Sequence, residues 1–108
     1  MVRQVVALVA ALSLAVPTAV QAGDIAFTVI NDSSYDLVSF YSAPVDAQTW
    51  GNNLLGRYKL RARTKGTATI AGGAEQCIYD LKYVLSDGET YYKRDLDICQ
   101  ISSYRIFD

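Results

Sequence analysis

Residues 76–99, QCIYDLKYVLSDGETYYKRDLDIC, decide the fold because they contain the two clearest strands of the chain. Segments 76–85 and 91–99 are rich in Tyr, Ile, Leu and Val, residue types that favour extended structure. They flank Asp87-Gly88, and this dipeptide between two apolar runs predicts a hairpin because Gly accepts positive φ. The sequence therefore predicts an antiparallel pair of strands here.

The charges of the hairpin favour one register over another. A four-residue loop over 87–90 sets Lys82 opposite Asp95. A two-residue loop would instead set Lys82 opposite Lys93 and Asp80 opposite Asp95. Because like charges directly opposite each other destabilise a strand pair, we expect the longer loop.

The N-terminal residues 1–22 have the three parts of a secretory signal peptide. Arg3 precedes an apolar stretch over 5–16, and Val20-Gln21-Ala22 presents residues that a signal peptidase reads. The apolar stretch is shorter than the roughly 20 residues that a membrane-spanning helix needs. We therefore expect cleavage after Ala22, a single β domain over 23–108, a secreted or periplasmic location and no stable membrane anchor.

Cys77 and Cys99 lie at the outer ends of the hairpin. In an exported protein an even count of cysteines indicates a disulfide, and two cysteines allow one pairing. The expected register leaves Cys77 one step from opposition to Cys99, so a bend or bulge at that end would close the bridge. A catalytic redox pair is the alternative, but such pairs usually stand two residues apart at the start of a helix.

Further stretches of strand-forming residues lie on both sides of the hairpin. They cover 25–31, 37–42, 55–63, 67–71 and 102–107, and a short helical turn is an alternative for 45–50. Asn31-Asp32-Ser33-Ser34 is a turn cluster, although its first three residues also fit a glycosylation acceptor. Six or seven short strands predict an all-β fold, a small antiparallel β-sandwich of the immunoglobulin kind. An open meander or a small barrel is the alternative.

Composition excludes several kinds of chemistry. The chain has no His, and therefore lacks the commonest general base and transition-metal ligand. It contains no Gly-rich phosphate loop. The formal net charge is −1, and the basic residues over 57–65 alternate as on the solvated face of a strand. We therefore expect no enzyme activity, no catalytic residue, no cofactor and no nucleic-acid partner.

Three acidic residues, Asp80, Asp95 and Asp97, are weak candidates for a metal site. In the expected register they lie close together on one face of the hairpin. Three carboxylates can hold Ca²⁺, and two can act as acid and base on a glycosidic bond. Lys82 and Arg94 are neutralising neighbours, which favours a solvated strand face instead.

The candidate binding residues are three aromatic residues and one amide: Tyr41, Trp50, Tyr92 and Asn53. Trp50-Gly51-Asn52-Asn53 stands in the longest connection, where recognition residues often gather. A Trp beside amides can stack on a sugar or hold a peptide. The alternative is that Trp50 folds back to cover one end of the core. Tyr91 and Tyr92 are adjacent, so only one of them can face inward from a strand.

Several short motifs resemble those of one protein group. They are Asn31-Asp32-Ser33-Ser34-Tyr35, Leu37-Val38-Ser39-Phe40-Tyr41, Trp50-Gly51-Asn52-Asn53-Leu54-Leu55-Gly56, Cys77-Ile78-Tyr79-Asp80-Leu81-Lys82 and Leu96-Asp97-Ile98-Cys99. Together they resemble a widespread group of small exported bacterial proteins of unknown function, some labelled twin-arginine-signal protein or argininosuccinate lyase. The resemblance implies an exported, β-rich protein of undetermined activity. The single Arg3 departs from a twin-arginine signal, and a lyase of that kind is several times longer and all-helical.

These observations predict a non-catalytic module that binds an unknown protein or glycan partner. The alternative is a structural or envelope-stress accessory protein without a discrete ligand site. A binding module should expose a contiguous aromatic patch near Trp50, Tyr41 or Tyr92, whereas an accessory protein should bury those rings.

Overall fold

The fold of this protein is known from a computed structural model that describes residues 22–108, so the predicted signal peptide up to residue 21 lies outside the described residues. Within residues 22–108 the chain forms six strands and one short helix. They are β1 (Ile25–Asp32), β2 (Leu37–Pro44), β3 (Thr64–Ile70), α1 (Gly73–Gln76), β4 (Ile78–Leu85), β5 (Thr90–Asp97) and β6 (Ser103–Phe107). No helix of this described part is long and apolar enough to cross a membrane.

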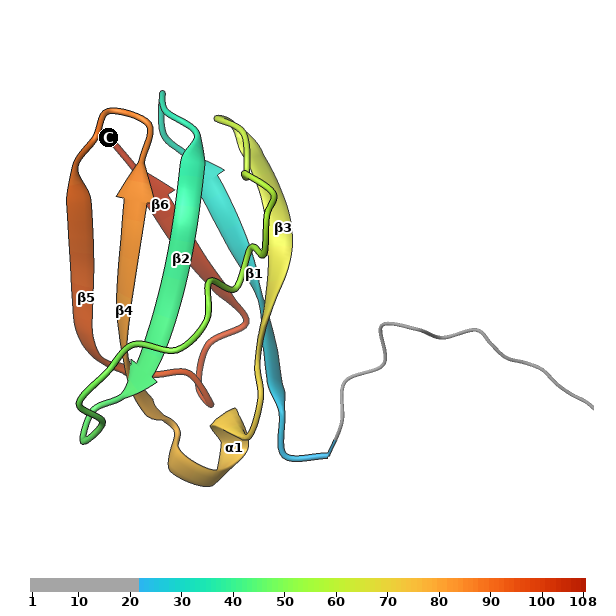
Figure 1. The fold of residues 1–108 in the computed structure, drawn as a ribbon. Coiled ribbons are helices and arrows are strands. Elements are labelled where there is room, and N and C mark those ends of the chain that lie inside the picture. The colour runs from blue at the N-terminus through green and yellow to red at the C-terminus, as the bar shows by residue number, and fades with distance from the viewer. Residues whose placement is uncertain (1–21) are drawn as a thin grey trace, which may run out of the picture.

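The strands form two sheets, ordered β3-β1-β6 and β2-β4-β5, which face each other as two layers (Figure 1). One buried core joins the layers. Its members are Phe27, Val29, Leu37, Phe40, Ala68, Ile70, Tyr79, Leu81, Leu85, Ile98 and Ile106. The predicted small β-sandwich is therefore confirmed.

Five strands follow the immunoglobulin order. β1 pairs antiparallel with β3, and β4 lies antiparallel between β2 and β5, as strands B, E and C, F, G do in immunoglobulin domains. The sixth strand departs from it, because β6 pairs parallel with β1. The chain leaves β5 at the end of the molecule where β1 begins, so it enters the second sheet running in the same direction as β1 (Figure 1). The expectation of a purely antiparallel sandwich is corrected accordingly.

The β4–β5 hairpin forms where it was predicted, but in a different register. Lys82 lies opposite Tyr92, so its expected pairing with Asp95 is wrong, and so is the alternative pairing with Lys93. Residues 86–89 form the loop, in which the Gly88 N–H donates to the carbonyl of Leu85 at the end of β4 over 3.0 Å. Like-charge avoidance alone did not identify this register, because the turn sets it: Val84 lies opposite Thr90, and Lys82 follows two pairs farther along.

The bulge lies in β5, toward the cysteines, as expected for that end: between the pairs Tyr79–Leu96 and Leu81–Lys93, the single residue Asp80 faces two residues of β5. The Asp80 carboxylate accepts a hydrogen bond from the Asp95 N–H (3.0 Å) and from the Arg94 guanidinium (3.0 Å). Asp95 has φ 57°, a left-handed conformation that Asp tolerates better than most residues. The Asp80 carboxylate thus bonds to the backbone of Asp95 and not to its side chain, so the two carboxylates are not placed directly opposite each other.

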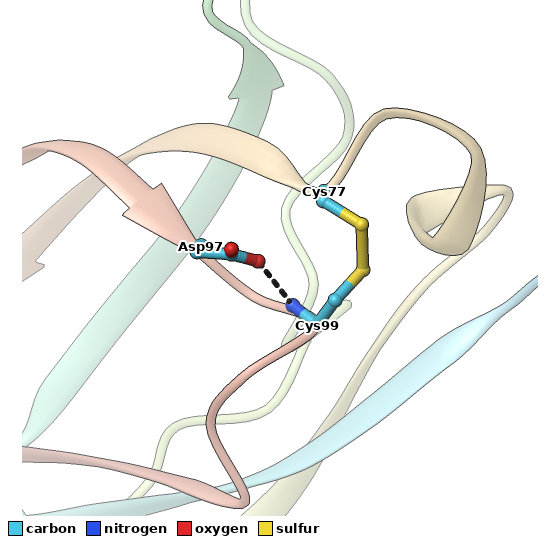
Figure 2. Close-up of side chains that lie close together, drawn as sticks. All are labelled: Cys77, Asp97 and Cys99. Carbon is cyan, nitrogen blue, oxygen red and sulfur yellow. Dashed lines mark hydrogen bonds between the residues drawn. A yellow bond between two sulfur atoms is a disulfide. The ribbon is translucent and has the colours of Figure 1, made fainter.

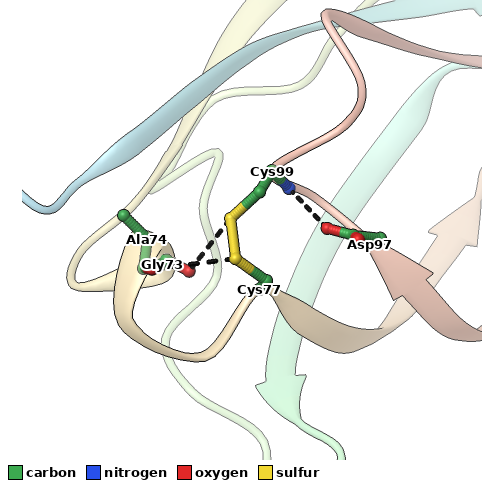
Figure 3. Close-up of a disulfide and its surroundings, with 5 residues drawn as sticks. All are labelled: Gly73, Ala74, Cys77, Asp97 and Cys99. Atoms are coloured by element: carbon green, nitrogen blue, oxygen red, sulfur yellow. Dashed lines mark hydrogen bonds between the residues drawn. A yellow bond between two sulfur atoms is a disulfide. The ribbon is translucent and has the colours of Figure 1, made fainter.

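The disulfide between Cys77 and Cys99 is present and joins the two ends of the hairpin, with Cα atoms 5.2 Å apart. Two local turns bring the sulfurs together. Cys77 follows α1 with φ 65°, and the Asp97 carboxylate accepts a hydrogen bond from the Cys99 N–H over 3.0 Å (Figure 2). The bridge also lies against the carbonyl of Gly73 at the start of α1 (Figure 3). It therefore ties α1 and the hairpin ends into one corner of the molecule.

Residues 55–63 form no strand, so that prediction is wrong. One bridge pairs Leu60 with Leu37, and their backbone groups exchange hydrogen bonds of 2.8 and 2.9 Å. The Leu54 N–H also donates to the carbonyl of Phe40 over 2.7 Å. This segment lies along the outer edge of β2 instead of pairing over its whole length. Its basic side chains are exposed, as expected from their alternation.

The remaining local expectations are partly met. Residues 45–50 form no helix in the described structure, and the Ala47 N–H closes a β-turn on the carbonyl of Pro44 over 2.9 Å. The helix α1 was not expected. Gly73 at its start is buried, and a Cβ there would lie only 2.8 Å from Ile98 Cδ1, so glycine is required by the close packing.

The turn cluster after β1 is built around Asn31, which is fully buried. Its Nδ2 donates to the carbonyls of Tyr35 (2.9 Å) and Leu60 (3.0 Å), and its Oδ1 accepts from the Ser33 hydroxyl (2.7 Å). The amide is thus a structural group that joins the turn to the β2–β3 connection. Because the side chain is enclosed, the glycosylation pattern at Asn31 has no accessible acceptor in the folded domain.

Candidate functional site

One row of large side chains crosses the outer face of the β2-β4-β5 sheet. Tyr41 on β2 lies opposite Lys82 on β4, and Lys82 lies opposite Tyr92 on β5. Residues directly opposite each other in a sheet point to the same face, while their chain neighbours point to the other. The neighbours Phe40 and Leu81 are fully buried in the core, so the row lies on the outer face.

Two further side chains complete a cluster around this row. The Trp50 ring, from the connection after β2, lies 6.2 Å from the Tyr92 ring. The Lys82 ammonium is 4.8 Å from the centre of the Tyr41 ring and 5.2 Å from that of Trp50. The Arg94 guanidinium is 5.0 Å from the Tyr92 ring and 5.9 Å from Trp50. We call these five residues the cation–aromatic cluster.

The cluster carries positive charge held among aromatic rings. Each such contact contributes about 0.5–1 kcal/mol at an exposed position. Arg94 is partly neutralised by Asp80, whose Oδ2 lies 3.0 Å from it. The hydrogen bond from the Asp95 N–H, followed by the bond and charge of Arg94, lowers the pKa of Asp80 below its usual value. No ion pair within residues 22–108 includes Lys82, so its ammonium faces the rings without a carboxylate partner.

The rings are partly open to solvent. Tyr92 is 54% exposed, while Tyr41 and Trp50 are half-buried. A hollow of about 220 Å³ lies beside Trp50, between Pro44, Asp80 and the cluster. Trp50 contacts the outer face of the sheet and is not packed against the core, which removes the alternative that it covers one end of the core.

The sequence-predicted binding residues are thus divided by the structure. Tyr41, Trp50 and Tyr92 come together, whereas Asn53 does not join them. The Asn53 Oδ1 accepts hydrogen bonds from the N–H groups of Phe40 (3.0 Å) and Leu55 (3.1 Å). Its amide fastens the connection to β2, and therefore helps to position the segment that carries Trp50.

The three acidic candidates do not assemble as expected. Within the described residues, the one group of three potential ligands within 4.8 Å of one another is Cys77, Asp97 and Cys99. Its sulfurs are bonded to each other and the Asp97 carboxylate is bonded to the Cys99 N–H (Figure 2). Asp80 is engaged with Arg94, and the bulge removes the shared face on which the three carboxylates were expected.

Lys82 and Arg94 are the members of the cluster that sequence reasoning treated only as neutralising neighbours. The signal that could have identified them is the alternation of aromatic and basic residues on facing strands. That signal becomes informative only in the observed register, where Lys82 lies between two tyrosines. No family model, curated protein or solved structure matches this chain.

Proposed function

We propose that this protein is a non-catalytic binding module of the periplasm or cell exterior, and that its cation–aromatic cluster binds an acidic glycan. The observation that supports this function is the position of the Lys82 ammonium between partly open aromatic rings, with no carboxylate partner in the described residues. An acidic sugar offers both complementary groups, a C–H face for a ring and a carboxylate for a cation.

The shape of the surface favours an extended ligand over an enclosed one. The hollow beside Trp50 has about 220 Å³, whereas small-molecule pockets usually enclose about 300–1,000 Å³. The row from Tyr41 to Tyr92 crosses three adjacent strands. A chain of sugar units can follow such a row. Each contact is then weak, and specificity comes from several contacts made together.

The proposed location rests on two features of the chain. The N-terminal segment has the composition of a signal peptide, and the domain contains a disulfide. Disulfides persist in oxidising compartments such as the periplasm and the extracellular space.

A specific observation favours a second candidate, an accessory protein without a ligand site. Every ring of the cluster already contacts a cation of the same chain. Such contacts can simply hold the outer face together. The two candidates differ in whether the cluster changes its environment when a ligand is added.

Titration of the oxidised protein with oligogalacturonate, followed by Trp50 fluorescence, tests the proposal. We expect a saturable change that weakens with salt and is absent with a neutral maltooligosaccharide of the same length. Lys82→Ala and Tyr92→Ala should each lower the affinity about tenfold, corresponding to about 1.4 kcal/mol.

Matched controls keep the test specific to the cluster. Lys93→Ala removes an exposed lysine that faces the other side of β5, and Tyr58→Ala removes a tyrosine that is 69% exposed elsewhere. Both should bind as the unchanged protein does. Equal responses to acidic and neutral sugars, or no response at millimolar sugar, would favour the accessory protein instead.

A further inference from the structure

A separate cleft of about 420 Å³ opens between the two sheets. Its walls come from the β1–β2 turn, from the β4–β5 hairpin and from the end of β6. It contains no member of the cation–aromatic cluster. Its volume lies within the range of about 300–1,000 Å³ that is usual for small-molecule sites.

Four of the eight residues that line the cleft are aromatic. Tyr83 and Tyr91 stack with ring centres 5.6 Å apart on the inner face of the hairpin. Tyr35 and Phe107 line the same cleft and are 42% and 68% exposed. These rings remain partly open although they belong to a small sandwich with a well-filled core. The adjacent Tyr92 points to the opposite face of β5, so the cleft and the cluster are distinct surfaces.

The charge around the cleft is negative. Asp108 is part of the lining, and no basic side chain is. At the rim the Tyr91 hydroxyl donates a hydrogen bond of 2.8 Å to the Asp87 carboxylate. The charge of Arg63 acts on Asp108, but its guanidinium is bound to the carbonyl (2.7 Å) and carboxylate (3.1 Å) of Asp32.

Two of the polar groups at the cleft, the Asp108 carboxylate and the Tyr91 hydroxyl, are already engaged. The Asp108 carboxylate accepts hydrogen bonds from both the N–H and the hydroxyl of Ser34, and the Tyr91 hydroxyl donates to Asp87. The cleft therefore offers ring faces and negative potential, and its carboxylate already accepts hydrogen bonds from the protein. A cation without N–H groups matches this combination better than a primary ammonium, which needs acceptors for its three protons.

We propose that the cleft between β5 and β6 binds a small quaternary ammonium ion, with Tyr35, Tyr91 and Phe107 contacting its methyl groups. Recognition of quaternary ammonium by aromatic rings is an established use of cation–π attraction. The site is independent of glycan binding on the outer face, so either proposal can fail without the other.

Choline titration followed by NMR of the aromatic signals tests this site in the oxidised protein. 3,3-Dimethyl-1-butanol is the matched neutral probe, because it has the same shape with carbon in place of nitrogen. We expect saturable shifts of the Tyr35, Tyr91 and Phe107 signals with choline, and at least about fivefold weaker binding of the neutral probe.

Single substitutions assign the ligand to the cleft. Tyr35→Ala and Phe107→Ala should each weaken choline binding about fivefold, and Tyr58→Ala, at a tyrosine that is 69% exposed outside the cleft, should not. Melting temperatures of all variants establish that each remains folded. Equal affinity for both probes, shifts outside the cleft, or no saturation at tens of millimolar choline would overturn the proposal.

Discussion

The two faces of the β2-β4-β5 sheet are made by neighbouring residues with opposite roles. Phe40 and Leu81 are fully buried and join the two layers, while the adjacent Tyr41 and Lys82 lie in the cation–aromatic cluster. Because successive residues of a strand point to opposite faces, the residues that stabilise the domain alternate with those that can contact a ligand. Substitutions on the inner face should unfold the domain, and those on the outer face should change what it contacts.

The comparison is tested most strongly at Leu81, which is 0% exposed. Leu81→Ala leaves a cavity between the layers and should lower the free energy of unfolding by about 2–5 kcal/mol. Urea denaturation measures the loss. The neighbouring Lys82→Ala should change stability by less than about 1 kcal/mol. Equal losses at the two positions would refute the division between the faces.

The disulfide should have the next largest effect. Replacement of both Cys77 and Cys99 by Ser opens a loop with a sequence separation of 22 residues. The chain-entropy account predicts a loss of about 3 kcal/mol. Urea denaturation of the double variant and of the reduced, unmodified protein should give similar midpoints. A double variant as stable as the oxidised protein would show that the corner near α1 is held by packing alone.

Asp80, which is bonded to Arg94 of the cluster, should contribute less to the free energy of unfolding than the disulfide does, and its contribution should depend on pH. Its pKa is lowered mainly by the Asp95 N–H bond, so the folded state favours the charged form. This stability is present above the unfolded pKa of about 3.9 and is lost as the pH falls through the lower folded value. Asp80→Asn should cost about 1 kcal/mol at pH 7.

Thermal melts of the Asp80→Asn variant between pH 7 and pH 2 check this prediction. The difference from the unchanged protein should shrink below about pH 4. Asp108, whose pKa is also lowered because Ser34 bonds to it, is present in both proteins and cancels. A difference that stays constant with pH would mean that the carboxylate charge does not stabilise the bulge.

Tyr91 should show the smallest effect, confined to alkaline pH. The hydrogen bond to Asp87 raises the pKa of Tyr91 to about 12, so the folded state favours the neutral hydroxyl. This contribution is complete below the unfolded pKa of about 10 and is lost as the pH rises to the folded value. Tyr91→Phe should leave the melting temperature at pH 7 almost unchanged.

Ultraviolet titration of tyrosine ionisation checks that assignment. The Tyr91→Phe variant should lack one step near pH 12, while the Tyr58→Phe control should keep it. Persistence of the step in Tyr91→Phe would show that Asp87 does not hold the hydroxyl proton. That result would also remove Asp87 from the rim of the proposed cation site.

Much of the fold could be predicted because its signals are local. The Asp87-Gly88 turn, the alternation along 78–85 and the terminal cysteines each depend on residues close in sequence. The register could not be predicted from charge pairing. It is set at the turn, where Val84 lies opposite Thr90, and it shifts at the bulge, where the Asp80 carboxylate bonds to the Asp95 backbone.

Segment 55–63 is a second place where the sequence alone did not predict the structure. Its alternation of basic and apolar residues is typical of a strand, and the basic side chains are exposed as expected, but so is Tyr58 between them. Whether such a segment becomes a strand depends on a partner over its whole length. Here the outer edge of β2 pairs with the segment at only a few residues, chiefly Leu37. The segment therefore runs along that edge without forming a strand.

Residues close together in the chain indicate which segments prefer strands, where the hairpin turns and which two cysteines can pair. The sequence also identified Tyr41, Trp50 and Tyr92 as candidate contacts, because large aromatic rings in strands and loops are informative without a fold. Only the tertiary structure decided the parallel placement of β6, the register and the joining of those rings with Lys82 and Arg94. The physical reason is that a shift of one residue in a strand pair moves every side chain to the opposite face, so contacts between distant residues exist only after the register is set.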